Sequence, residues 1–192
     1  MYFKEKDIPR TMETNSIVFF NDVHYQQLPN QPIIAAWQII NPENIGNMIR
    51  LADNIGAPQV FILGTNFQLR MTSIKKTAGL SFANVKLSFV SPEDFLEQLP
   101  VDYTLAAIET CRDSQNIFQC SLPDKIAFLL GNERHGLPEE ILQKCSLKIH
   151  IPMTGKCKSM NVSHALGTAL FEWQRQMLFS GQNSVNSPIV AE

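Results

Sequence analysis

The sequence predicts an α/β domain built on a mostly parallel β-sheet with helices on both faces. Short apolar stretches alternate with stretches in which apolar residues recur every three or four positions, as strands alternate with amphipathic helices. Most of the strand-like stretches are apolar throughout, which is typical of strands buried on both faces. Together these two features favour a parallel sheet with a helical layer on each side.

Length and composition indicate one compact domain. The 192 residues are 44% hydrophobic and 18% charged, which is enough apolar material for a substantial core. We expect an N-terminal extension over residues 1–32, the main domain over residues 33–180 and a C-terminal tail over residues 181–192. No internal repeat or low-complexity tract interrupts the main domain.

The first half of the domain opens with a predicted strand over residues 33–40, which is apolar and rich in β-branched side chains. A turn over residues 41–44 leads into a helix that Gly56 ends, and a second buried strand follows over residues 59–63. The buried face of that helix is expected to consist of Ile45, Met48, Ile49, Ala52 and Ile55.

The second half continues the alternation. Ser91 is a predicted cap for a helix that begins with Pro92, and the last helix begins just after Ser159 and Asn161, either of which can cap it. The expected strands cover residues 85–90, 103–108, 125–130 and 147–151, and the expected helices cover residues 92–99, 138–144 and 162–177.

Polar loops that contain glycine follow three of the strands, over residues 41–47, 131–137 and 153–161. Ligands of parallel sheets bind where such loops leave the carboxyl ends of the strands. The last loop also runs into a helix N-terminus, whose free N–H groups and dipole favour ligand binding, although simple helix capping explains it as well. None of the loops carries the glycine pattern of a dinucleotide site or a P-loop.

Charge restricts where nucleic acid can bind. The net charge is −2, so any nucleic-acid site must be a local patch. Residues 65–92 contain no acidic residue, and phenylalanines lie between the basic side chains, so Arg70, Lys75 and Lys76 are candidate RNA contacts. A solvated helix face with ordinary core aromatics is the alternative.

Metals and membranes are not expected partners. The four cysteines form no C-x-x-C pair and lie at no ligand spacing from a histidine, so we expect no metal site. The first ten residues contain no apolar signal segment, and no apolar run approaches the roughly 20 residues that span a bilayer. We therefore expect a cytoplasmic protein with reduced thiols.

The three loops together resemble one known family. Residues 41–50 read NPENIGNMIR, residues 130–137 read LGNERHGL, and IPM at residues 151–153 is followed by SMNVS at residues 159–163. In this order and at strand ends, these motifs resemble the SpoU (TrmH-like) RNA ribose methyltransferases of the SPOUT superfamily. The resemblance covers about residues 33–177.

The resemblance implies several features that periodicity does not show. It implies a deep trefoil knot in the C-terminal part, a homodimer with the active site near the interface, and bound S-adenosylmethionine. Carried over by position, the expected cofactor pocket consists of Leu130, Gly131, Ile151, Met153, Ser159 and Met160.

Arg50 matches the catalytic arginine of the first motif. It is predicted to act at the ribose hydroxyl, either as a base or as a cation that holds RNA phosphate and stabilises negative charge on oxygen. We favour the cation, because arginine keeps its proton. Asn44 and Asn161 are expected to bond ribose or cofactor or to orient Arg50, and Glu133 to hold Arg50 or backbone N–H groups, or to cap a helix.

Ser159 offers a hydroxyl group near the cofactor or the attacking oxygen. Lys156 and Lys158 are candidate RNA phosphate contacts, and an ordinary loop role for both lysines is the alternative.

The predicted function is S-adenosylmethionine-dependent methylation of a ribose 2′-hydroxyl in tRNA or rRNA. The compact length favours tRNA, because it leaves no room for a separate RNA-binding domain. A catalytically inactive RNA-binding protein of the same fold is the main alternative, and an unrelated nucleotide-binding α/β enzyme is the weaker one.

Overall fold

The structure is a computed structural model that describes residues 27–65 and 67–180. Residues 1–26, which make up most of the expected N-terminal extension, and the expected tail over residues 181–192 lie outside the described residues.

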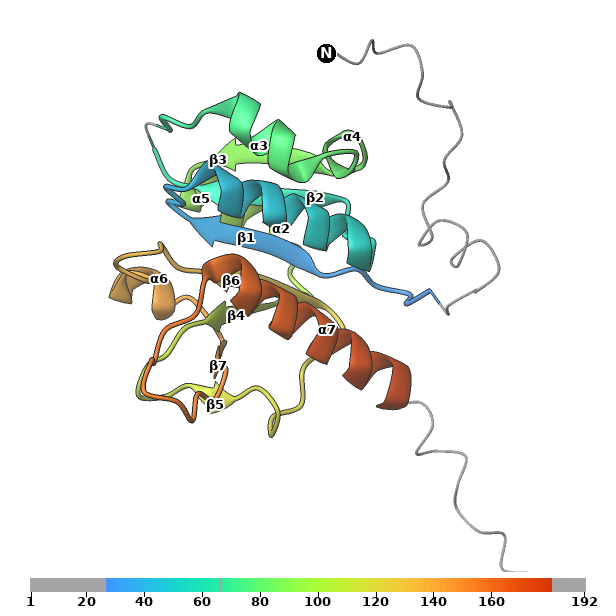
Figure 1. The fold of residues 1–192 in the computed structure, drawn as a ribbon. Coiled ribbons are helices and arrows are strands. Elements are labelled where there is room, and N and C mark those ends of the chain that lie inside the picture. The colour runs from blue at the N-terminus through green and yellow to red at the C-terminus, as the bar shows by residue number, and fades with distance from the viewer. Residues whose placement is uncertain (1–26, 66, 181–192) are drawn as a thin grey trace, which may run out of the picture.

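One parallel sheet organises the described chain (Figure 1). Its strands are β1 (Ile33–Trp37), β2 (Gln59–Leu63), β3 (Lys86–Val90), β4 (Thr104–Ile108), β5 (Gln115–Asn116), β6 (Ile126–Leu130) and β7 (Leu147–His150). Their order across the sheet is β3-β2-β1-β6-β4-β7-β5, and the pairings of these named strands are all parallel. The parallel sheet expected from the sequence is therefore confirmed.

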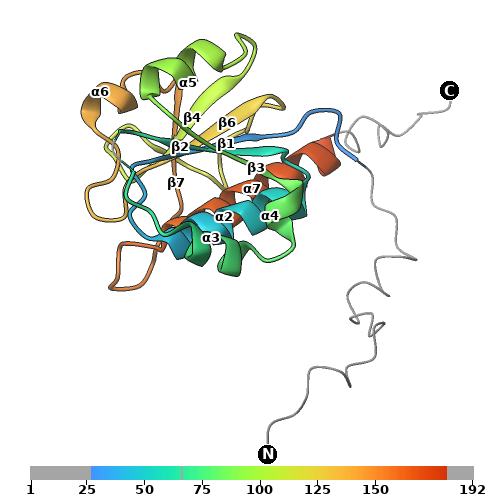
Figure 2. The same ribbon diagram turned by 90° about the horizontal axis from the view of Figure 1, so that it is seen from above.

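Helices cover both faces of the sheet. They are α2 (Pro42–Ile55), α3 (Met71–Ala78), α4 (Ser81–Asn84), α5 (Pro92–Gln98), α6 (Glu139–Leu142) and α7 (Val162–Ser180). Figure 2 shows α2, α3, α4 and α7 on one face and α5 and α6 on the other. The core therefore consists of two apolar layers separated by the sheet, and β6 at its centre is buried along its whole length. Helices on both faces were predicted, and this prediction is also confirmed.

Helix α2 ends before Gly56, as the sequence predicts, but it starts at Pro42, inside the predicted turn over residues 41–44. The Asn41 side chain accepts a hydrogen bond from the Glu43 N–H at 2.8 Å, and Pro42 occupies the first turn. Gly56 follows the helix with a φ of 78°, a left-handed conformation that glycine adopts without strain. The predicted apolar face of α2 is buried, which fixes the direction in which the preceding loop faces.

Helix α7 is fastened to the chain between β5 and β6. Gln176 donates a hydrogen bond to the Cys120 carbonyl oxygen at 3.1 Å and accepts one from the Leu122 N–H at 2.8 Å. Glu172, which is only 8% exposed, accepts hydrogen bonds from Gln176 and Arg175. The Arg175 guanidinium is the main reason that the pKa of Glu172 is lowered. The two bonds of Gln176 hold the far end of α7 against the chain that precedes β6.

The structure corrects several predicted boundaries. The predicted strand over residues 33–40 ends at Trp37, because Gln38 has a φ of 43° that breaks the extended conformation. The segment between β4 and β6 contains the two-residue strand β5, and the basic segment over residues 65–92 contains α3 and α4. The periodicity predicted none of these three elements. Helix α7 extends three residues beyond the predicted end at residue 177.

Gly46 sets the close approach of α2 to α3, so we predict that Gly46→Ala destabilises the protein. A Cβ atom at this position would lie 2.5 Å from Thr77 Cβ and 2.9 Å from the Ile74 carbonyl oxygen. We expect the free energy of unfolding in urea to fall by about 1–3 kcal/mol, because such overpacking outweighs the helix propensity of alanine.

Gly167→Ala is the matched control, since its added Cβ would lie 3.4 Å from Leu51 and make an ordinary contact. This control should leave stability unchanged or raise it by up to about 1 kcal/mol. Equal effects of the two substitutions would contradict the packing account.

Candidate functional site

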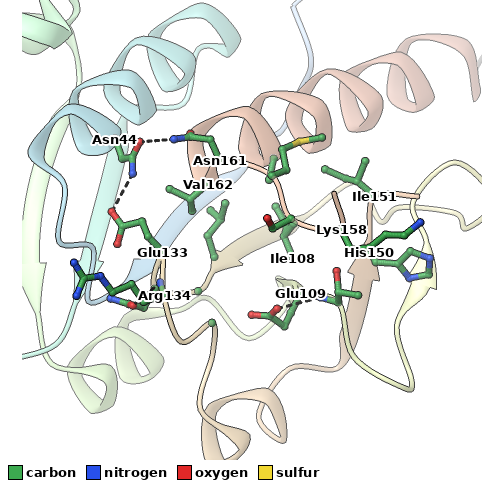
Figure 3. Close-up of a pocket in the computed structure, with 18 of the residues that line it drawn as sticks. Asn44, Ile108, Glu109, Glu133, Arg134, His150, Ile151, Lys158, Asn161 and Val162 are labelled. Atoms are coloured by element: carbon green, nitrogen blue, oxygen red, sulfur yellow. Dashed lines mark hydrogen bonds between the residues drawn. The ribbon is translucent and has the colours of Figure 1, made fainter. Parts of the chain in front are cut away.

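A cavity of about 630 Å³ lies at the carboxyl ends of four adjacent strands, β1, β6, β4 and β7. Chain segments that follow each of these strands form its walls, and Figure 3 shows side chains from all four segments around one space. Its apolar lining is formed by Ile40, Ile108, Leu130, Ile151, Met153, Met160, Val162 and Ala165. Its polar lining includes Asn44, Glu109, Thr110, Asn132, Glu133, Arg134, His150, Lys158, Ser159 and Asn161.

A chain of side-chain hydrogen bonds joins the three loops that the sequence singles out (Figure 3). Asn161 Nδ2 donates to Asn44 Oδ1 at 3.0 Å, and Asn44 Nδ2 donates to Glu133 Oε1 at 2.9 Å. Asn44 is 4% exposed, so its amide is shielded from water and depends on these two partners. The loops after β1, β6 and β7 are therefore held in one arrangement.

The Glu133 carboxylate accepts hydrogen bonds from the first loop. The donors are the backbone N–H groups of Ile40 and Asn41, each at 3.0 Å, in addition to the Asn44 amide. Partial burial of the carboxylate acts to raise its pKa, but these hydrogen bonds stabilise the ionised form, and the pKa of Glu133 is lowered overall. Of the roles weighed for Glu133, holding backbone N–H groups is the one that these contacts match.

Asn161 rather than Ser159 accepts hydrogen bonds at the start of α7. Asn161 Oδ1 accepts from the Ser163 N–H at 2.9 Å, from the Ser163 hydroxyl at 2.7 Å and from the His164 N–H at 3.4 Å. Because the other end of the same amide bonds to Asn44, one side chain both caps α7 and connects it to α2.

Glu109, which sequence reasoning missed, supports the loop after β6. Its Oε2 accepts a hydrogen bond from the Leu137 N–H at 3.0 Å. A Cβ at Gly136 would lie 2.6 Å from the same oxygen, and Gly136 has a φ of 66°, so glycine is required there on both counts. The signal that could have identified Glu109 was its place directly after the predicted strand over residues 103–108, at the end of β4.

His150 is the second missed residue. Its Nδ1 lies 2.9 Å from Ser114 Oγ, and the Ser114 hydroxyl donates to the Cys111 carbonyl oxygen at 2.6 Å. Since the hydroxyl has one proton and uses it on Cys111, the ring Nδ1 is the donor to Ser114. His150 also lines the cavity.

The structure brings most of the predicted site residues together. The cavity lining includes every residue of the expected cofactor pocket as well as Asn44, Glu133 and Asn161. Lys158 also lines it, and its Nζ donates to the Met153 carbonyl oxygen at 2.7 Å. The roles assigned to these residues stay predictions.

The other predicted RNA contacts lie outside the cavity lining. Arg50 is exposed on α2, Lys156 is exposed in the loop before α7, and Arg70, Lys75 and Lys76 are exposed at α3. The cavity of one chain thus contains the expected cofactor residues without the arginine expected at the ribose.

Two further findings concern metals and membranes. Within residues 27–65 and 67–180, no group of three or more His, Cys, Asp and Glu side chains is placed to hold a metal ion. None of the helices in this part of the chain is long and apolar enough to cross a membrane.

Comparison with protein families identifies relatives over most of the chain. The model of the SpoU rRNA Methylase family matches residues 31–171. A tRNA (cytidine(34)-2′-O)-methyltransferase of Aeromonas hydrophila is 32% identical over 153 residues, which is 77% of this chain and 96% of that enzyme. The 23S rRNA (guanosine-2′-O-)-methyltransferase RlmB of Neisseria meningitidis is 29% identical over 146 residues, which is 75% of this chain.

Several of these relatives are longer than the segment that matches this chain. The chain spans 58% of the Neisseria enzyme and 9% of the mouse tRNA (guanosine(18)-2′-O)-methyltransferase TARBP1.

Solved structures share the fold. The structure of an AdoMet-bound rRNA methyltransferase from Sinorhizobium meliloti matches 80% of this chain and 59% of its own, with a TM-score of 0.70 and 26% identity. A structure from a study of 2-OH methylation of C/U34 on tRNA matches 78% of this chain and 98% of its own, with a TM-score of 0.71 and 29% identity.

The hydrogen bonds to Glu133 predict a pH-dependent loss of stability in Glu133→Gln. The folded-state pKa of Glu133 lies below its ordinary value of 4.5, so its contribution is present at neutral pH and is lost as pH falls through that folded-state pKa. At pH 7 we expect the free energy of unfolding to fall by about 1 kcal/mol, because the bonds are charge-assisted but partly solvated.

Urea unfolding curves at a series of pH values from neutral to below 4 measure this effect. The difference in the free energy of unfolding between the native protein and Glu133→Gln should become smaller in acid. The control is Glu140→Gln, at an exposed glutamate of α6, which should unfold with the same free energy as the native protein at every pH. A difference in the free energy of unfolding that stays constant in acid would contradict the role of the ionised Glu133 carboxylate as a hydrogen-bond acceptor.

Proposed function

Because the chain belongs to the SpoU rRNA methylase family, we propose that it is an S-adenosylmethionine-dependent RNA methyltransferase that methylates a ribose 2′-hydroxyl group in tRNA or rRNA. The observation that carries the proposal is the cavity at the strand ends, in which three loops that match the family motifs are joined by the bonds of Asn44. A tRNA substrate is favoured, because the chain covers nearly the whole of a tRNA-specific relative. A cytoplasmic location is part of the proposal and rests on the RNA substrates of the relatives.

The cavity residues fit S-adenosylmethionine. A volume of about 630 Å³ suits a ligand of this size. Apolar side chains such as Leu130, Ile151 and Val162 provide walls for a flat base, and the carboxyl groups of Glu109 and Glu133 complement a positive charge. When bound, the cofactor supplies a methyl group that a positively charged sulfur already activates.

The residues of the chain contribute positioning more than chemistry. Asn44 and Asn161 fix the loops after β1 and β7 relative to each other, so that two bound reactants can meet in one geometry. Such positioning can lower a barrier by about 7–11 kcal/mol in favourable cases. Glu133 keeps the first loop in place rather than removing a proton, since its carboxylate already accepts three hydrogen bonds.

Arg50 is proposed to complete the site across a twofold axis of a homodimer. Its exposure on α2, outside the cavity lining of its own chain, leaves it free to reach the pocket of a second copy. Phe171 and Phe179, which are 49% and 53% exposed on α7, support an apolar interface of this kind. At the partner's pocket, the guanidinium would hold an RNA phosphate and stabilise negative charge on the 2′-oxygen.

A C-terminal trefoil knot is the topological part of the proposal. The connection from β6 to β7 crosses β4 with α6 on one face of the sheet. The chain then passes the strand ends and returns as α7 on the opposite face, where it contacts α2. This crossing supports a knot formed by the segments that line the cavity.

Calorimetric titration with S-adenosylmethionine tests the function directly, and methyl incorporation into total tRNA or into rRNA identifies the substrate. We expect saturable binding and incorporation into one RNA class. Absence of cofactor binding would remove the enzyme proposal and favour an inactive RNA-binding protein of the same fold.

For Arg50→Ala, we predict loss of methyl transfer with nearly unchanged affinity for S-adenosylmethionine, because Arg50 lies outside the cofactor cavity. Methyl incorporation and calorimetry on the same preparation measure the two quantities. Lys144→Ala, which removes an exposed cation next to α6, is the control and should keep full activity. Full turnover by the Arg50 variant would show that the role is misassigned.

For Lys75→Glu combined with Lys76→Glu, we predict weaker RNA binding with unchanged cofactor binding. Both lysines are exposed on α3, and the change replaces two phosphate-attracting charges with repelling ones. Fluorescence anisotropy with labelled tRNA measures the loss, and Lys144→Glu with native affinity is the control. RNA affinity equal to that of the native protein would show that Lys75 and Lys76 are not part of an RNA-binding surface.

A further inference from the structure

A second groove lies at the outer edge of the sheet, between β3 and the helices α3 and α4. It is a cavity of about 460 Å³ that shares no lining residue with the pocket at the strand ends. Its walls are formed by Pro58, Met71, Phe82, Ala83, Asn84, Val85, Lys86, Leu87 and Phe89. We refer to this set as the edge groove.

The floor of the edge groove is aromatic and firmly anchored. Phe82 and Phe89 are partly buried against the core, and the rings of Phe67 and Phe89 pack with centroids 4.8 Å apart. Met71 is 38% exposed at the first turn of α3. The groove therefore offers apolar surface that a flat ligand can cover without rearranging the core.

The rim of the edge groove is basic. Lys75 Nζ lies 5.2 Å from the centroid of the Phe82 ring, and Lys86 is exposed within the lining. The segment from residue 65 to residue 92 has no acidic side chain in a chain whose net charge is −2. An acidic side chain of the neighbouring α2, Asp53, lies close to this rim, where it accepts hydrogen bonds from Asn84 at 3.2 and 3.3 Å.

This combination matches the chemistry of an unpaired nucleotide. A base stacks on an aromatic side chain, while the phosphates on either side of it attract lysines. A peptide strand paired with the open edge of β3 is less favoured, because Lys86 places a charge at the start of that edge, and such charges oppose strand addition.

We propose that the edge groove holds an unpaired nucleotide of the RNA substrate, with its base against Phe82 and its phosphates near Lys75 and Lys86. This inference rests on the proposed function, since it takes RNA as the substrate. The edge groove would provide a contact separate from the pocket at the strand ends, so that the RNA would bind the protein at two places. Lys76 and Arg70 would extend the phosphate path along α3.

The test compares binding of a labelled single-stranded RNA to the native protein and to Phe82→Leu by fluorescence anisotropy. Leucine keeps the apolar anchor in the core and removes the stacking face. We expect binding to weaken by roughly 5- to 150-fold, the range of one base–aromatic stack. Phe118→Leu is the control, because it makes the same change at an exposed phenylalanine that follows β5 at the opposite edge of the sheet, and it should bind as the native protein does.

Lys86→Ser provides a second variant at an exposed position, where folding is not at risk. We expect the slope of log affinity against log salt to become shallower by about 0.7, the value for one phosphate contact on a single strand. Native affinity and slope in both variants would overturn the inference and leave the edge groove open to a peptide strand.

Cofactor calorimetry and methyl incorporation on the same preparations separate this inference from the proposed function. If the native protein binds cofactor and methylates RNA while both variants bind RNA normally, only the inference about the edge groove fails. If the native protein neither binds nor methylates RNA, the proposed function fails, and the inference fails with it.

Discussion

The buried amide of Asn44 is the interaction on which the site depends. It receives a hydrogen bond from Asn161, 117 residues later in the chain, and gives one to Glu133, 89 residues later. An unpaired amide at this depth would cost about 1–3 kcal/mol, so each of the three loops is stabilised in the position that satisfies the other two. One side chain in α2 therefore links two segments from distant parts of the sequence at the pocket.

The sheet order makes this convergence geometrically simple. Strands β1, β6, β4 and β7 are neighbours and parallel, so their carboxyl ends meet at one edge, although β1 lies far from the others in sequence. Helix α7 is fixed at its far end by Gln176 and at its start by Asn161. Rigid elements thus carry the loops, which is what a reaction dominated by positioning requires.

Much of this arrangement could be predicted from local signals. The central strands were predictable, because a strand buried on both faces is apolar throughout. The three loops that match the family motifs were also predictable as a site, and they line the pocket. What could not be predicted depends on single dihedral angles or distant partners. The φ of Gln38 ends β1 before two isoleucines that read as strand, and β5 forms because two residues pair with β7.

The same limit applies to the site residues. The sequence left Ser159 and Asn161 equivalent as caps, and it gave Glu133 several roles, because the choice depends on which donors are near in space. Glu109 and His150 went unnoticed, since their partners Leu137 and Ser114 lie on other segments.

Hydrogen–deuterium exchange with and without S-adenosylmethionine tests the central claim most directly. If three loops form one binding site, the cofactor should slow exchange together in residues 40–47, 130–137 and 150–163, with β3 and α5 as unaffected internal references. Protection confined to one of these loops, or confined to segments that do not line the cavity, would contradict the account.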